Sequence, residues 1–143
     1  MKAVLLGVGQ AGGKLATAIA QFDADAGYGA VLDALAVNTA ATDLDPLPID
    51  AVLVGQSRVN GHGVGGDNEL GAEVMDEDAV EVLGALAPKL TADAEALFVV
   101  AGLGGGTGSG GAPVLVRELS RVYDVPVYAL GVLPGRDEGA MYQ

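Results

Sequence analysis

Residues 102–113 read GLGGGTGSGGAP, and seven of the first ten residues of this stretch are glycine. The stretch directly follows ALFVV at 96–100, one of the most apolar runs in the chain. Glycine loses more conformational freedom on folding than any other residue, so its concentration here indicates backbone that must approach something closely. A glycine-rich segment between a buried strand and a helix is a candidate anion-binding loop.

The chain around this stretch is predicted to alternate buried strands with helices. Continuous apolar runs, typical of parallel strands buried on both faces, predict strands at 3–6, 31–37, 51–54, 96–100 and 125–133. Apolar stripes at helical spacing predict helices over 10–22, 70–87 and 112–123. This order predicts an α/β fold with a three-layer, Rossmann-like parallel sheet and right-handed crossovers.

The predicted elements carry further expectations. Phe22 belongs to the apolar stripe of the first helix, and Pro113 suits the first turn of the third. A doubly wound sheet usually ends with a helix over its last strand, and the sequence reaches Gln143 before such a helix. We therefore expect residues 1–143 to form one incomplete N-terminal domain, truncated after about the fifth strand.

Composition excludes several classes of protein. The chain has no cysteine, which rules out disulfides and thiolate metal sites and leads us to expect a cytoplasmic protein. No apolar run approaches the ~18 residues of a membrane span, so we expect no membrane insertion. The net charge is −12, which argues against nucleic acid as a partner because phosphate backbones need a basic face.

Acidic residues gather in ELGAEVMDEDAVE at 69–81. Glu69, Glu73, Glu77 and Glu81 share one face of the predicted helix, and no Lys or Arg lies nearby in the sequence. Like charges at this spacing destabilise a helix by roughly 0.2–0.5 kcal/mol per pair, and molar salt screens that repulsion. The pattern favours a salt-rich cytoplasm, as in halophiles, over an ordinary solvated acidic face.

A second glycine-rich segment, GVGQAGGK at 7–14, also follows a predicted strand and opens a helix. Helix N-termini offer unpaired N–H groups and the positive end of the helix dipole, and glycines let an anion come close. The carboxyl ends of parallel strands lie at one edge of a sheet. Two such segments at that edge predict a polyphosphate site.

The first segment alone leaves the ligand open. Gly7, Gly9 and Gly12 match the G-x-G-x-x-G pattern of dinucleotide-binding proteins, so an NAD-type Rossmann oxidoreductase is an alternative. That class needs an acid at the end of the second strand, where this chain has Asn38 and Thr39. A P-loop is disfavoured because Leu15 stands where Ser or Thr would hold Mg²⁺.

The second segment is more specific. GGGTGSG at 104–110 resembles the signature of the tubulin/FtsZ superfamily of GTPases. Further stretches resemble that family's nucleotide loops in chain order: GVGQAGGK, AVNTAATDL at 36–44, GHGVGGDNELG at 61–71 and LPGRDEGAMY at 133–142. The details are similar to the archaeal CetZ branch, which implies a tubulin-like, filament-forming GTPase implicated in cell shape.

The resemblance implies a site for GTP or GDP, with Mg²⁺ expected and no protein ligand assigned to it. The first loop is implied to wrap the α- and β-phosphates, mostly through backbone N–H groups, with Gln10, Ala11, Gly12, Gly13 and Lys14. The second is implied to hold the β- and γ-phosphates with Gly105, Gly106, Thr107, Gly108 and Ser109, the Thr107 hydroxyl donating. Glu138 is implied to accept from the ribose hydroxyls, and Gly65, Gly66 and Asp67 to sense the γ-phosphate.

Some of these positions have simpler readings. Thr107 or Ser109 could serve as side-chain caps of the following helix, which is compatible with phosphate binding. Lys14 could be a solvated side chain. His62, the single histidine, is interpreted as a loop residue because the chain has no second His or Cys to complete a metal site.

The resemblance also implies that this chain contains no catalytic residue. In the family, the next subunit of a filament supplies an acidic loop that positions the attacking water, and that loop follows a long central helix beyond position 143. We therefore expect self-association into filaments and GTP hydrolysis from a full-length protein, and nucleotide binding with little turnover from residues 1–143. A non-catalytic filament-capping fragment is the remaining alternative.

Overall fold

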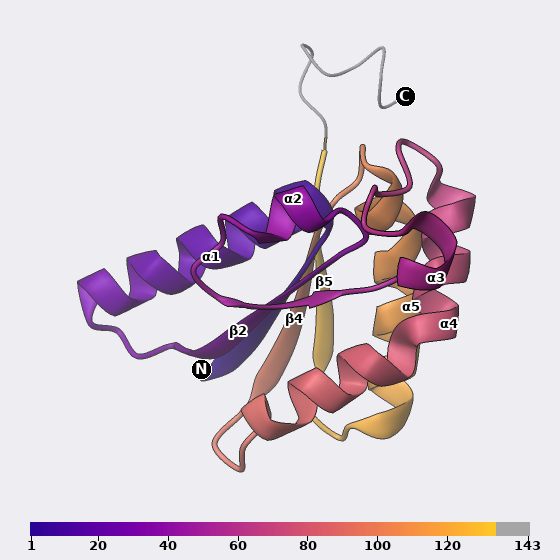
Figure 1. Ribbon diagram of the computed structural model, residues 1–143. Coiled ribbons are helices and arrows are strands. Elements are labelled where there is room, and N and C mark those ends of the chain that lie inside the picture. The colour runs from indigo at the N-terminus through magenta and orange to yellow at the C-terminus, as the bar shows by residue number, and fades with distance from the viewer. Residues whose placement is uncertain (134–143) are drawn as a thin grey trace.

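The computed structural model describes residues 1–133, in which strands and helices alternate (Figure 1). The strands are β1 (Ala3–Val8), β2 (Val31–Asn38), β3 (Asp50–Leu53), β4 (Ala96–Gly102) and β5 (Val127–Val132). The helices are α1 (Gly9–Ala26), α2 (Ala41–Leu44), α3 (Gln56–Val59), α4 (Asn68–Leu86) and α5 (Gly106–Val122), with a 3₁₀ turn, η1, at Ala87–Lys89. All five predicted strands are present.

The strands form one parallel sheet in the order β3-β2-β1-β4-β5, with α1 and α2 on one face and α4 and α5 on the other (Figure 1). The predicted fold class, a three-layer parallel α/β sheet, is confirmed. Strands that alternate with helices give this architecture because each crossover returns the chain to the edge of the sheet at which every strand begins. The carboxyl ends of β1, β2 and β4 therefore meet at one edge.

Two apolar clusters hold the layers together. The larger one joins the sheet to α4 and α5 and includes the fully buried Leu6, Leu97, Met75 and Leu115. The smaller one lies under α1 and is built on Leu5, Ala16 and Ala34. Consecutive residues of β1 face opposite helical layers, which explains why the strand is apolar throughout.

Two expectations about the helices were wrong. Phe22 is 67% exposed and lies tilted against Tyr28, because the part of α1 that packs on the smaller cluster ends at Ile19 and Ala20. The third helix begins at Gly106, so Pro113 lies in its interior and not in its first turn. The first turns of α5 contain four glycines, and each lowers helix stability by about 0.8–1.0 kcal/mol relative to alanine. Close packing of α5 against α4 outweighs this cost.

The acidic face of α4 also differs from expectation, because basic residues reach it from elsewhere in the chain. Arg58 of α3 donates to Glu73 (3.1 Å) and Glu77 (2.9 Å), and Arg117 of α5 donates to Asp76 (2.9 Å). The hydrogen bond to Glu73 and the charge of Glu77 raise the pKa of Arg58. These pairs are exposed, so screening by salt weakens them too.

We expect the melting midpoint at pH 7 to rise by at least about 4 °C between ~0.1 and ~3 M KCl, since screening removes repulsion worth roughly 1 kcal/mol among the unpaired acids. Arg58→Gln should lower the midpoint in ~0.1 M KCl, where the ion pairs of Arg58 with Glu73 and Glu77 stabilise the fold. The same substitution should lower the midpoint by less in ~3 M KCl, where salt screens these pairs. Circular dichroism melts of both proteins measure this. A midpoint that does not change with salt would refute the halophile hypothesis.

A second charge cluster lies at the opposite edge of the sheet from the carboxyl ends of the strands. The Lys89 ammonium donates to Asp33 (3.0 Å) and Asp50 (2.6 Å), near the starts of β2 and β3. The hydrogen bond from Lys89, and then its charge, hold the pKa of Asp50 below its usual range. Burial lowers the pKa of Lys89, but the two carboxylates outweigh burial and the net pKa is raised. A depressed carboxyl pKa stabilises the fold above about pH 4, and that contribution is lost as the pH falls through the lowered pKa.

Candidate functional site

The carboxyl edge of the sheet brings the two glycine-rich segments together. β1 and β4 pair in parallel with Val8 opposite Ala101, so both strands end at the same level. α1 begins at Gly9, immediately after β1, and α5 begins at Gly106, a few residues after β4. The two helix N-termini therefore open at neighbouring points of one edge, as the polyphosphate argument requires.

The two segments touch each other at Gly9 and Gly108. Gly9 has a φ of +79°, and a Cβ built on it would lie 3.0 Å from the Gly108 nitrogen. A Cβ on Gly108 would lie 2.8 Å from the Gly102 carbonyl oxygen and 3.1 Å from that of Val8. Because these neighbours are backbone atoms, neither position has room for a side chain, and glycine is needed at both.

Neither helix carries a side-chain cap. The N-cap residues are Val8 for α1 and Gly105 for α5, and neither makes a side-chain capping hydrogen bond. The Ser109 hydroxyl contacts the Gly105 carbonyl oxygen, and the Thr107 hydroxyl pairs with that of Thr39. The reading of Thr107 or Ser109 as a helix cap was therefore wrong. Within the described residues, no side-chain cap therefore competes with an anion for the first N–H groups of either helix.

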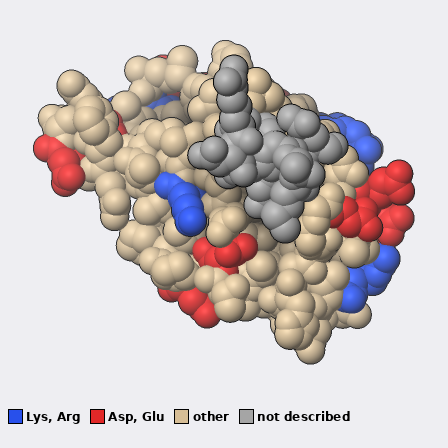
Figure 2. Space-filling model, turned by 90° about the horizontal axis from the view of Figure 1, so that it is seen from above, with Lys and Arg blue, Asp and Glu red and all other residues tan. Residues whose placement is uncertain are grey.

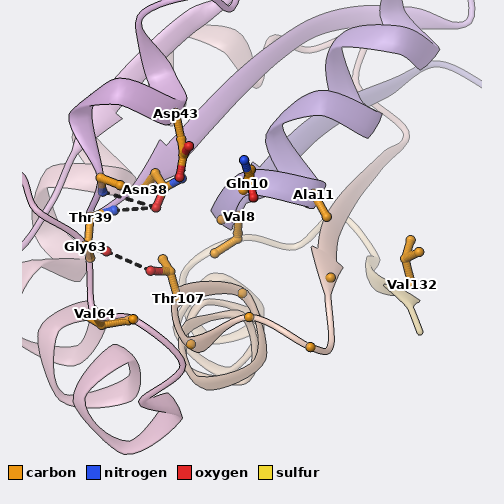
Figure 3. A pocket seen from close by; sticks show the side chains of 18 of the residues that line it. Val8, Gln10, Ala11, Asn38, Thr39, Asp43, Gly63, Val64, Thr107 and Val132 are labelled. Atoms are coloured by element: carbon orange, nitrogen blue, oxygen red, sulfur yellow. Dashed lines mark hydrogen bonds between the residues drawn. The ribbon is translucent and has the colours of Figure 1, made fainter. Parts of the chain in front are cut away.

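A pocket of about 360 Å³ lies between the two helix N-termini and the loop that follows β2 (Figure 3). Its polar lining comes from Gln10, Asn38, Thr39, Asp43, His62 and Thr107. Within the described chain no Lys or Arg lines it. Where described residues are visible in the view from above, most of them are uncharged, and charged side chains occur in small groups (Figure 2). Among the described residues, the groups that could hold an anion in this pocket are therefore backbone N–H groups and hydroxyls.

Comparison with known proteins identifies the architecture. A sequence model of the "Tubulin/FtsZ family, GTPase domain" matches residues 2–143. The chain belongs to the tubulin/FtsZ family. The relationship to the CetZ branch of that family is also confirmed. The tubulin-like protein CetZ2 of Haloferax volcanii is 69% identical over 143 residues, which make up all of this chain and 40% of the relative.

Solved structures of two relatives agree with this assignment. CetZ2 from Haloferax volcanii, in a GTPγS-bound protofilament, superposes with a TM-score of 0.96 at 69% identity, over 99% of this chain and 42% of that one. CetZ1 from the same organism, a GDP-bound monomer, gives a TM-score of 0.95 at 53% identity, over 99% of this chain and 44% of that one. The chain thus spans about 40% of the length of these family members.

The structure brings six of the predicted nucleotide-binding residues to the pocket wall. These are Gln10, Ala11, Gly105, Gly106, Thr107 and Gly108, and Gly65 of the predicted γ-phosphate sensor joins them. They come from the start of α1, the start of α5 and the loop before α4. The two loops that the family resemblance pairs across the sheet edge do face the same space.

Other predicted residues lie away from the pocket lining. Gly12 packs against the Val100 carbonyl of β4, and a Cβ on Gly13 would lie 3.0 Å from the Leu47 side chain, so both allow α1 to approach its neighbours. Lys14 is exposed on α1. Three further predicted residues, Ser109, Gly66 and Asp67, are also absent from the lining; the Asp67 carboxylate instead caps α4 by accepting from the Leu70 N–H (3.0 Å). Glu138 lies outside the described residues.

Sequence reasoning assigned no site residue to one wall of the pocket. Asn38, Thr39, Ala40 and Asp43 lie at the end of β2 and in the loop after it, which was recognised as resembling a family nucleotide loop but was given no site residue. The Asn38 side-chain oxygen accepts from the N–H groups of Thr39 (2.8 Å) and Ala40 (3.3 Å), which shapes the turn. Polar residues at the carboxyl end of a buried parallel strand are the signal that would have pointed to this wall.

His62, read from the sequence as a loop residue, is exposed at this wall, where its segment forms a single antiparallel bridge with Ala40. The prediction that His62 is a loop residue is confirmed, since its backbone lies outside the helices and strands of the sheet.

The described residues contain no group of three His, Cys, Asp or Glu side chains placed to hold a metal ion. Among the described lining residues Asp43 is the one carboxylate, and its Oδ2 accepts from the Asn38 side chain (3.4 Å). Magnesium in phosphate sites uses one or two carboxylates and takes its other ligands from phosphate oxygens and water. The pocket therefore fits a magnesium ion that enters with a polyphosphate.

Between residues 1 and 133, no helix is both long and apolar enough to cross a membrane.

Proposed function

We propose that this chain binds GTP and GDP in the pocket at the carboxyl edge of its sheet. The observation that carries the proposal is that two uncapped helix N-termini, those of α1 and α5, meet at one pocket. No Lys or Arg is among the described residues that line this pocket. Such an arrangement concentrates N–H donors and positive helix dipoles on a polyphosphate. The relatives solved with GTPγS and GDP support the choice of guanine nucleotide.

The residues divide into direct and indirect roles in this proposal. The start of α5, from Gly106 to Gly108, donates backbone N–H groups to phosphate oxygens, and Gln10 and Ala11 approach from α1. Gly12, Gly13, Lys14 and Ser109 act indirectly, by setting the path of the two helices or by long-range charge. Asp43 is the residue that would help to hold a magnesium ion bound with the nucleotide, and that ion would neutralise phosphate charge. Glu138 is kept as the proposed ribose acceptor.

We also propose that the whole protein is a cytoplasmic GTPase that self-associates into filaments and contributes to cell shape. The CetZ2 relative, solved as a GTPγS-bound protofilament, supports self-association. Residues 1–143 alone should turn GTP over slowly. Asp43 is the one carboxylate among the described lining residues, and a hydrogen bond with Asn38 restrains it, so it is poorly placed to orient an attacking water.

Isothermal titration distinguishes this function from an NAD-type oxidoreductase. We expect GDP to bind at least ~100-fold more tightly than guanosine, because losing the phosphate hydrogen bonds, each worth about 1.5–3 kcal/mol, removes most of the affinity. We expect a similar preference over NAD⁺, because its diphosphate is esterified at both ends and offers no terminal phosphate to the helix N-termini. GTP turnover should be on the order of 10⁻³ s⁻¹ or slower, like an unassisted GTPase. NAD⁺ binding as tight as GDP binding would overturn the proposed guanine nucleotide site. Faster GTP turnover would overturn the proposal that residues 1–143 alone hydrolyse GTP slowly.

A further inference from the structure

Thr39 is a fully buried polar residue in the pocket wall. It has 0% relative exposure, and its hydroxyl oxygen lies 2.7 Å from that of Thr107 (Figure 3). Thr107 is slightly exposed, at 6%, and belongs to the first turn of α5, where the proposed phosphate site lies. The two threonines are 68 positions apart in the sequence, so the pair joins the loop after β2 to the start of α5.

The direction of this hydrogen bond decides what Thr107 can offer a ligand. Each hydroxyl has one proton, and only one of the two protons can lie between the oxygens. If Thr107 donates to Thr39, it has no proton left for a phosphate. If Thr39 donates to Thr107, the Thr107 proton is available to an anionic oxygen in the pocket. A bound phosphate therefore selects the second arrangement.

The backbone of Thr39 is held independently of its side chain. Its N–H donates to the Asn38 side-chain oxygen (2.8 Å), and its carbonyl accepts from the Gly63 N–H (3.0 Å). These bonds fix Thr39 to the turn after β2 and to the segment that carries Gly65. The hydroxyl is thus the part of Thr39 that reaches α5, and it can be removed without removing the backbone contacts.

We propose that Thr39 is a positioning residue for nucleotide binding: its hydroxyl donates to Thr107 and thereby directs the Thr107 proton to a phosphate oxygen. The inference rests on the proposed function and deepens it. Hydrogen bonds in such a chain polarise one another, so Thr39 strengthens a contact that it does not itself make. It also joins the phosphate site at α5 to the loop that carries Gly65.

The test is the GDP affinity of the full chain and of variants at these two positions, measured by titration calorimetry. Thr39→Val keeps the shape and removes the hydroxyl, and we expect it to weaken GDP binding about 5–10-fold, the effect of one lost hydrogen bond. Thr39→Ser keeps the donor and should stay within ~2-fold of the parent. Thr39→Ala serves as a second hydroxyl-free variant if Thr39→Val does not fold.

A double-mutant cycle tests whether Thr39 acts through Thr107. Thr107→Val alone should weaken GDP binding at least as much as Thr39→Val, and adding Thr39→Val to it should cost no more than ~2-fold further. A merely structural role would give independent losses and no rescue by serine. Two outcomes with a parent that binds GDP would contradict the role of Thr39. One is equal GDP affinity of Thr39→Val and Thr39→Ser. The other is a double variant whose loss of affinity is the product of the losses in Thr39→Val and Thr107→Val. If the parent does not bind GDP, the proposed function fails and this inference with it.

Discussion

Replacing Gly110 with alanine is expected to lower the free energy of unfolding by about 2–3 kcal/mol. Gly110 lies inside α5, where a Cβ would overlap the Asn68 carbonyl oxygen at the start of α4 and lie 2.9 Å from the Ala72 nitrogen. Both neighbours are helix backbone, so no side chain can rotate away. The two helices would have to separate, and that would open the larger apolar cluster between them.

Gly84 provides a matched control. It is also inside a long helix, α4, but a Cβ there meets nothing within 4 Å. Gly84→Ala should therefore stabilise the protein by about 0.5–1 kcal/mol through helix propensity alone. Urea denaturation of the parent and both variants in one buffer gives the comparison. Shifts of the two variants in the same direction would show that close helix packing does not explain the glycine at position 110.

Replacing Gly108 with alanine is expected to weaken GDP binding by ~30-fold or more, which corresponds to about 2 kcal/mol. The added Cβ would lie 2.8 Å from the Gly102 carbonyl and 3.1 Å from the Val8 carbonyl, the last residues of β4 and β1. It would push the start of α5 away from the start of α1. N–H groups on the two helices would then no longer converge on one polyphosphate, and at least one charge-assisted hydrogen bond worth about 1.5–3 kcal/mol would be lost.

Titration calorimetry at a temperature well below the midpoint of each variant measures this loss, with Gly84→Ala again as the control outside the pocket. A melt of each sample confirms that the variant is folded where its binding is measured. Affinity of Gly108→Ala within ~3-fold of the parent would mean that the contact between the two glycine segments does not set the phosphate site.

The strands and the site edge were predictable from the sequence because they depend on local patterns. Runs such as ALFVV predict a buried parallel strand, and a glycine-rich segment directly after the strand marks the carboxyl edge of the sheet. The resemblance of GGGTGSG to a family signature then made the fold specific, and comparison with known proteins confirmed it.

What the sequence did not predict depends on contacts between distant segments. Arg58 reaches Glu73 and Glu77 because α3 lies beside α4, and nothing in the local charge pattern indicates that proximity. Thr39 reaches Thr107 because the loop after β2 passes the start of α5. The start of α5 at Gly106 was missed because helix propensity disfavours glycine, whereas packing between backbones requires it.

The same short turn of α5 faces both α4 and the pocket, which constrains how this protein can change. A Cβ on Gly106 would lie 2.7 Å from the Val64 side chain, and a Cβ on Gly71 of α4 would meet the Gly106 carbonyl. A substitution here therefore alters thermal tolerance and ligand affinity at once. Selection for one property cannot act at these positions without disturbing the other, so adaptation to a new temperature or salt concentration should accumulate at sites such as Gly84, away from the glycine turn.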